Sequence, residues 1–251
     1  MLKNLLKNIL PYGVVMRIKT KSLSSKEFKE QFDKYSESLK DNRFLCNWED
    51  INPRLNDNTN YTNFDSHYLY HPAWAARILK KTNPNLHIDI SSSVYFVSYI
   101  SAFINIDFYD YRPAKIKLSG LNCKKADITK LHFENNSIDS ISCMHVIEHV
   151  GLGRYGDPID PKGDIKSINE LQRVTKKDGD ILFVVPVGKI SKIEFNAHRI
   201  YSFDHIINLF DKCRLIEFAL VTDDGNFIEN ASKKDSDNQS FGCGCFYFKK
   251  N

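Results

Sequence analysis

Short apolar runs alternate with segments of helical periodicity from residue 86 onward. Four runs have the length and apolar character of buried strands: Leu86–Ile90, Ile104–Tyr109, Ile138–Met144 and Ile181–Val185. Between them, Val94–Phe103 and Ile165–Thr175 have the spacing of helices. Strands that alternate with helices in this way indicate a parallel sheet covered on both faces. We therefore predict an α/β fold with a doubly wound, mostly parallel sheet.

The first 70 residues have a more polar pattern. A charged helix is predicted over residues 22–39, and an Asn-, Asp- and Thr-rich loop over residues 52–63. At the N-terminus, apolar residues fall on one helical face, which favours packing against the domain or a second subunit, or contact with a membrane surface: Leu2, Leu5, Leu6, Ile9 and Leu10. We predict a helical extension over residues 1–70 and a main domain over residues 71–251.

Composition narrows the class of protein. The chain has 251 residues, a net charge of +4 and lysines spread along its length, which does not favour a nucleic-acid surface. No run reaches the roughly 20 apolar residues of a transmembrane helix. The 6 cysteines lack paired C-x-x-C spacing, as expected for reduced thiols in the cytoplasm. Cys243 and Cys245 form only a C-x-C, a weak metal signal, and would share one face of a final strand.

Titratable and glycine residues are concentrated after the third predicted strand, in the run SISCMHVIEHVGLGRYGDPID. His145, Glu148 and His149 stand at i, i+3 and i+4, so a helical turn would bring them to one face. They could hold a metal ion, or one histidine could act as a general base. The spacing H-x-x-E-H also matches an inverted zinc-peptidase helix, although here it follows a strand.

The loop that follows carries three glycines and several polar side chains. Gly151, Gly153 and Gly156 do not form a dinucleotide fingerprint, because no strand-to-helix phosphate turn surrounds them. They predict a loop with unusual backbone angles. Four side chains on this loop are candidates to bind a polar, hydroxyl-rich substrate: Arg154, Tyr155, Asp157 and Asp160.

From about residue 70 onward the chain resembles the class I S-adenosylmethionine-dependent methyltransferases. The similarity lies in the first strand with its serine turn, in Asp110 after the second strand, and in the runs ADITKLHFENNSIDSISC and ELQRVTKKDGDILFVVP. The resemblance implies a Rossmann-like, seven-stranded sheet with an N-terminal lid. It implies S-adenosylmethionine as the cofactor, bound by Asp89, Ser91, Ser92, Asp110, Asp127, Ile128 and His145. The turn after Asp89 departs from the family because it contains no glycine.

Two narrower resemblances concern the substrate and the mechanism. The runs HVIEHVGLGRYGDPID and FNAHRIYS resemble a bacterial family of methyltransferase-like proteins linked with surface-polysaccharide synthesis, which adds Arg199 and Tyr201 as substrate-binding candidates. Metal-dependent O-methyltransferases have an E-x-x-E-H run at the same strand edge and a histidine after the fifth strand. This similarity implies a divalent metal ion with His145, Glu148, His149 and His198 as ligands.

These resemblances imply an O-methyltransferase that acts on a sugar hydroxyl. The expected acceptor is a nucleotide-linked or phosphorylated precursor of a capsule or lipopolysaccharide, and the expected catalytic residues are His145, His149 and His198. Two alternatives stay open. The first is a binding protein that has lost the cofactor on a methyltransferase scaffold, and the second is an H-x-x-E-H zinc hydrolase.

Overall fold

The computed structural model describes residues 23–40 and 43–251, which belong to two compact units. Residues 23–40 and 43–64 belong to the smaller unit, and residues 65–251 to the larger one. The amphipathic stretch predicted between Leu2 and Leu10, with its role in a dimer, lies outside the described residues. The lid over residues 1–70 stays a prediction.

The smaller unit contains the charged helix predicted from the sequence. Helix α1 (Ser25–Ser38) begins at Ser24, whose hydroxyl accepts the Glu27 N–H while the Glu27 carboxylate accepts the Ser24 N–H. This capping box satisfies two backbone donors at the helix start. A short 3₁₀ helix, η3 (Trp48–Asp50), brings Trp48 against Phe32 with ring centroids 5.0 Å apart.

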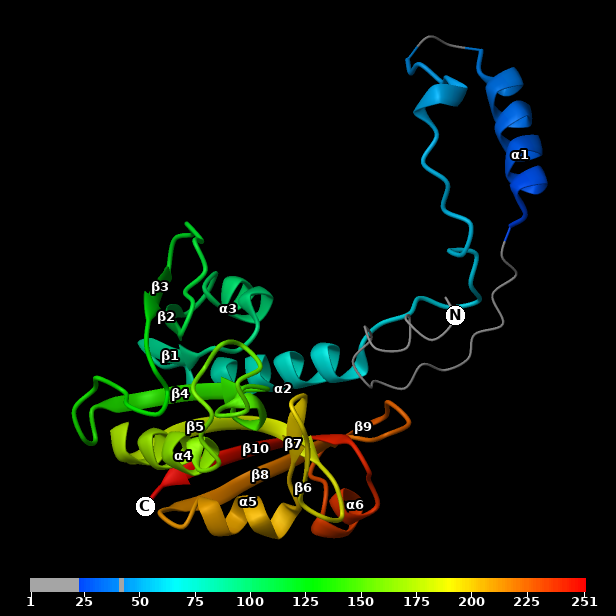
Figure 1. The fold of residues 1–251 in the computed structure, drawn as a ribbon. Coiled ribbons are helices and arrows are strands. Elements are labelled where there is room, and N and C mark those ends of the chain that lie inside the picture. Colours follow the sequence, from blue (N-terminus) through cyan, green and yellow to red (C-terminus); the bar gives the residue numbers. More distant parts are fainter. Residues whose placement is uncertain (1–22, 41–42) are drawn as a thin grey trace. The chain divides into compact units, whose positions relative to one another are not determined.

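The larger unit is built on a sheet with the strand order β3-β2-β1-β4-β5-β10-β8-β9 (Figure 1). Its strands are β1 (Leu86–Ile90), β2 (Asn105–Asp110), β3 (Leu121–Lys125), β4 (Ile138–Met144), β5 (Thr175–Val187), β8 (Cys213–Val221), β9 (Phe227–Ile228) and β10 (Gly242–Lys250). Strands β1 to β5 are parallel, whereas β10 pairs antiparallel with both β5 and β8. A separate hairpin joins β6 (Lys192–Glu194) to β7 (His198–Ile200).

Helices cover both faces of this sheet, as predicted for a doubly wound fold. Helices α2 (Ser66–Thr82) and α3 (Val94–Ile100) pack on one face, and α4 (Gly163–Val174) and α5 (Phe203–Leu209) on the other (Figure 1). Side chains along β5 alternate between the two cores, because successive residues of a strand point to opposite faces. Both faces are therefore apolar, which explains the continuous apolar run in the sequence.

Two sequence predictions about the fold need correction. The sheet has eight strands instead of seven, because Phe227–Ile228 adds the short strand β9 to its edge. This strand lies in a segment with a polar composition, and helix α6 (Lys233–Asp237) follows it. The helix predicted over Val94–Phe103 ends at Ile100, because residues 101–103 form a turn.

Across residues 23–40 and 43–251, no helix has both the length and the apolar character needed to cross a bilayer.

Candidate functional site

A cavity of about 680 Å³ lies at the carboxyl ends of β1, β2 and β4. Its wall is formed by the serine turn after β1, residues 110–112 after β2, residues 126–129 after β3, and residues 144–146 and 149–151 after β4. Part of the loop that runs to α4, from Tyr155 to Gly163, and Tyr68 of helix α2 (Ser66–Thr82) also line it. Ligands of open α/β sheets bind at this edge, and cavities of this size hold small molecules.

The serine turn after β1 is held by its own hydroxyl groups. Ser91 has a φ of 58°, a left-handed conformation that glycine adopts more readily, and its hydroxyl donates to the Tyr109 carbonyl at 3.2 Å. The Ser92 hydroxyl accepts the Met144 N–H at 3.1 Å. These bonds tie the turn to β2 and β4. They hold the turn in a conformation that glycine would adopt more readily, and the turn lines the cavity.

Asp89, near the end of β1, holds this turn in place and does not line the cavity. Its carboxylate is fully buried, accepts the Ser92 N–H at 3.0 Å and accepts the Ser142 hydroxyl. Burial raises the pKa of Asp89 to about 6, although the bonds from Ser142 and Ser92 oppose that rise. The structure therefore gives Asp89 a supporting position, where the sequence predicted a contact with the cofactor.

Asp110, Asp127 and Ile128 all line the cavity, as the sequence analysis expected for a cofactor site. The Asp110 carboxylate accepts the Arg112 N–H at 2.6 Å. The Asp127 carboxylate accepts the N–H and the hydroxyl of Thr129, at 2.9 and 2.7 Å. Each carboxylate closes its own turn and thereby has a fixed position beside the cavity.

The histidine run after β4 forms a single 3₁₀ turn, η4 (Ile147–His149), and lacks the long helix of a zinc peptidase. His145 adopts a φ of 56°, and its Nδ1 lies 2.8 Å from Oε1 of Glu148. Glu148 is 1% exposed. Burial alone would raise the pKa of Glu148, but the hydrogen bond and charge of His145 hold it below its usual value.

His149 has the geometry of a general base. Its Nδ1 donates to the Ala197 carbonyl at 2.7 Å, which leaves the lone pair on Nε2. Nε2 lies 3.7 Å from the Glu148 carboxylate, beyond hydrogen-bond distance, and the ring lines the cavity. Burial lowers the pKa of His149, so the ring is neutral at neutral pH and can accept a proton.

The three candidates on and after β7 do not line the cavity. Nε2 of His198 lies 3.2 Å from the Glu194 carboxylate, and its ring centroid is 6.5 Å from that of His149. Arg199 is buried and donates to the Val150 carbonyl at 2.7 Å. Tyr201 is buried and donates to Asp164 at 3.1 Å. Arg199 and Tyr201 therefore hold the two ends of the loop between β4 and α4 without facing the cavity.

The glycine-rich loop has the backbone angles that the sequence predicted. Gly151, Gly153 and Gly156 have φ values of 79°, 71° and 80°. The Asp157 carboxylate closes the loop by accepting the Gly151 N–H at 2.8 Å, and Asp160 accepts the Lys162 N–H at 3.0 Å. Both acids line the cavity while they hold this loop in shape.

Tyr155 and Arg112 line the cavity, and Arg154, predicted as a substrate-binding residue, does not line it but also lies over the Tyr155 ring. The guanidinium carbons of Arg112 and Arg154 are 5.0 and 5.1 Å from the centre of its ring. Arg154 also donates to the Ala197 carbonyl at 2.8 Å. This group brings cationic charge beside the cavity, and guanidinium groups suit phosphate because they present several fixed donors.

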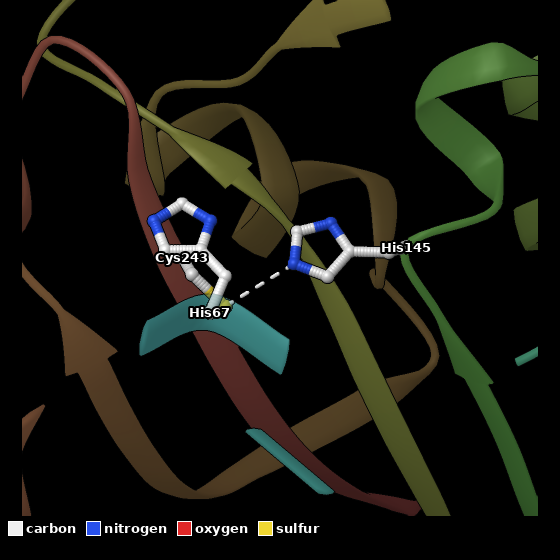
Figure 2. Close-up of side chains that lie close together, drawn as sticks. All are labelled: His67, His145 and Cys243. Carbon is white, nitrogen blue, oxygen red and sulfur yellow. Dashed lines mark hydrogen bonds between the residues drawn. The ribbon is translucent and has the colours of Figure 1, made fainter. Parts of the chain in front are cut away.

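Sequence reasoning missed a second cluster beside His145. His67 at the start of α2 and Cys243 on β10 lie next to it, and the ligand atoms of the three residues all lie within 4.8 Å of one another (Figure 2). The C-x-C spacing of Cys243 and Cys245 is only a weak metal signal in the sequence. One sequence signal pointed to the histidine, because His67, His71 and Trp74 have the spacing of one helical face. The structure shows that all three are buried on α2.

Comparison with known proteins places the chain in a family without an assigned function. A family described as "Caenorhabditis protein of unknown function, DUF268" matches residues 100–236, more than half of the chain. The chain belongs to this family. The matched residues include the histidine turn after β4 and the glycine-rich loop. Its sequence matches no protein among the curated ones searched.

Solved structures with a similar fold include methyltransferases. One is assigned as a sarcosine dimethylglycine methyltransferase from Galdieria sulphuraria, with a TM-score of 0.52, 13% identity, and coverage of 72% of this chain and 85% of the other. Another is 1,6-didemethyltoxoflavin-N1-methyltransferase from Burkholderia thailandensis, solved with 1,6-didemethyltoxoflavin and S-adenosylhomocysteine. Its TM-score is 0.51, with 9% identity and coverage of 72% and 79%. At these identities the likeness concerns the fold, which is the mixed α/β sheet fold of these methyltransferases.

Proposed function

We propose that the protein binds S-adenosylmethionine in the cavity and transfers its methyl group to a hydroxyl group. The observation that carries this proposal is the position of the cavity. It lies at the carboxyl ends of β1, β2 and β4, with acidic side chains after β2 and β3, in a sheet whose fold is that of methyltransferases.

The lining residues fit this cofactor in size and chemistry. A volume of about 680 Å³ accommodates a nucleoside with an amino-acid tail. Asp110, at the end of β2, suits hydrogen bonds from ribose hydroxyls, and Asp127 with Ile128 suits the adenine ring and its amino group. The bonds of Ser91 and Ser92 to β2 and β4 fix the turn that would border the methionine moiety.

When bound, S-adenosylmethionine supplies an electrophilic methyl group on a sulfonium centre. His149 accepts the proton of the acceptor hydroxyl at Nε2, because its Nδ1–H is held by the Ala197 carbonyl. The Glu148 carboxylate, 3.7 Å from Nε2, favours the imidazolium that forms. A metal ion near His145 is a second way to activate the hydroxyl, and it involves a different set of residues.

We propose a sugar as the acceptor, nucleotide-linked or phosphorylated, of the kind used for surface polysaccharides. Arg112 and Tyr155 support this choice because they offer a cationic group and an aromatic face at the cavity wall, and Arg154 adds a second cationic group beside Tyr155. Guanidinium groups recognise phosphate, and sugar rings pack on aromatic side chains. The link to polysaccharide precursors rests on the sequence resemblance alone.

A methyl-transfer screen tests this function. The full-length protein is incubated with S-adenosylmethionine and a panel of nucleotide sugars and sugar phosphates, and the assay detects both S-adenosylhomocysteine and the methylated sugar by mass. We expect one class of sugar to give both products in equal amounts. Release of S-adenosylhomocysteine without any methylated acceptor would contradict the sugar assignment. Absence of cofactor binding would leave a binding protein on this scaffold as the better description.

A further inference from the structure

The three side chains beside the cavity that could act as metal ligands come from distant parts of the chain. His67 lies in the first turn of α2, His145 follows β4, and Cys243 lies near the start of β10. Nε2 of His145 is 3.3 Å from Sγ of Cys243, and the rings of His67 and His145 are stacked with centroids 5.8 Å apart (Figure 2). His67 and Cys243 are buried, and the side chain of His145 is 7% exposed.

The distances suit one small metal ion. Zinc binds nitrogen at about 2.0–2.1 Å and sulfur at about 2.3 Å, so a tetrahedral ion separates its donor atoms by about 3.5 Å. The 3.3 Å between Nε2 of His145 and Sγ of Cys243 already matches that spacing. The His67 nitrogen lies within 4.8 Å of both atoms, and a small movement of its ring completes the set.

Surrounding groups orient the histidines as in known metal sites. The Glu148 carboxylate holds Nδ1 of His145 at 2.8 Å, so Nε2 is the nitrogen that faces Cys243. A carboxylate behind a ligating histidine fixes its orientation and makes it a stronger ligand. His71 lies beside His145 with ring centroids 5.0 Å apart, and its buried Nε2 has no hydrogen-bond partner among the described residues.

From this arrangement we propose that His67, His145 and Cys243 bind one divalent transition-metal ion, for which zinc is the best match. One thiolate and two imidazoles select zinc over magnesium or calcium, which prefer oxygen ligands. Three protein ligands leave the fourth position for water or a substrate oxygen. Because His145 also lines the cavity, the ion belongs to the cavity wall and Glu148 supports it from behind.

Without an ion, the same groups form a hydrogen-bonded cluster. Burial lowers the pKa of His67 to about 4 and raises that of the Cys243 thiol well above its usual value. A metal ion must displace the proton of the Cys243 thiol and any proton on Nε2 of His145.

Cobalt substitution tests the proposal directly and without a methyl-transfer assay. The full-length protein is reduced, stripped with a chelator and titrated with Co²⁺ in the absence of S-adenosylmethionine. We expect one Co²⁺ per chain, with the visible bands of a tetrahedral ion and a thiolate-to-metal charge-transfer band. Zinc should then displace the cobalt stoichiometrically.

Single variants assign the ligands. Cys243→Ser should remove the charge-transfer band, and His67→Ala should weaken binding by more than the roughly 10- to 100-fold expected for Glu148→Gln. Cys213→Ser and His205→Ala are matched controls on β8 and α5, and both should bind cobalt like the wild type. Circular dichroism of each variant shows whether it has folded.

Two results would overturn the site. The first is a wild-type protein that binds no Co²⁺ or Zn²⁺ stoichiometrically. The second is cobalt binding without a thiolate band, or with an affinity that Cys243→Ser leaves unchanged. Binding of S-adenosylmethionine to the metal-free protein is measured separately, so failure of the metal site is distinguishable from failure of the proposed methyl transfer.

Discussion

The turn after β1 and the turn after β4 border the same cavity, but they use their polar side chains in different ways. After β1, the hydroxyls of Ser91 and Ser92 and the carboxylate of Asp89 are engaged in bonds that hold the turn itself. After β4, His149 lines the cavity and His145 meets side chains from α2 and β10. The first turn therefore shapes a binding surface, and the second carries groups that can react.

This difference separates binding from chemistry in a way that single substitutions can test. Changes after β4 should affect the rate of methyl transfer and leave cofactor affinity nearly unchanged. Changes after β1 should affect stability and cofactor affinity. If a change in one turn altered both the rate of methyl transfer and the cofactor affinity, the two turns would act as one unit.

The largest effect is expected for His149→Ala. Loss of the base should lower the rate of methyl transfer by roughly 10²- to 10⁴-fold, because the hydroxyl proton loses its acceptor. Affinity for S-adenosylhomocysteine, measured by calorimetry, should stay within about two-fold, since binding does not require that proton transfer. His205→Ala on α5 is the control and should keep full activity. An unchanged rate in His149→Ala would remove the base assignment.

A smaller effect is expected for Asp89→Asn, whose stability relative to the wild type should depend on pH. The pKa of Asp89 is about 6 in the folded protein against 3.8 ordinarily, so its contribution to stability is complete below pH 4 and is lost as the pH rises through 6. The difference corresponds to about 3 kcal/mol. Between pH 4 and pH 7, the free energy of unfolding of Asp89→Asn, measured with urea, should rise by up to that amount relative to the wild type. An equal difference at the two pH values would contradict the buried, proton-binding carboxylate.

A matched glycine pair tests whether the loop after β4 is rigid. Gly151→Ala and Gly156→Ala introduce a Cβ at nearly the same φ, 79° and 80°. At Gly151 that Cβ would lie 2.1 Å from the Asp160 carbonyl oxygen, whereas at Gly156 nothing lies within 4 Å. Gly156→Ala should cost about 1 kcal/mol for backbone strain. Gly151→Ala should cost about 1–3 kcal/mol more, because its Cβ overlaps the Asp160 carbonyl. Equal losses of stability in the two variants, measured by thermal unfolding, would show that the loop adjusts to the added Cβ.

Most of the sheet could be predicted from the sequence because its signals are local. The apolar run of β5 and the alternation of cysteines on β10 follow from the two-residue period of a strand. Strand β9 could not be predicted, because two residues in a polar segment give no period and their pairing depends on β8. The angles of Gly151, Gly153 and Gly156 were predictable because a left-handed conformation favours glycine locally.

The site was harder to predict, because neighbours in space are not neighbours in sequence. His145, Glu148 and His149 were visible as a motif, yet His67 and Cys243 meet His145 only after α2 and β10 pack on the sheet. Arg199 and Tyr201 show the opposite difficulty. The resemblance of the run FNAHRIYS made them substrate candidates, but Arg199 on β7 and Tyr201 just after it lie against Val150 and Asp164.

Calorimetric titration with S-adenosylmethionine tests the central claim most directly. Asp110→Ala removes a carboxylate that lines the cavity, and Asp139→Ala removes an exposed one on β4 that pairs with Lys176. We predict that wild type and Asp139→Ala bind one equivalent with the same affinity. Asp110→Ala should bind roughly ten-fold or more weakly, because bonds to the ribose hydroxyls are lost. Equal affinity in all three proteins, or no binding to wild type at millimolar cofactor, would contradict the assignment of this cavity.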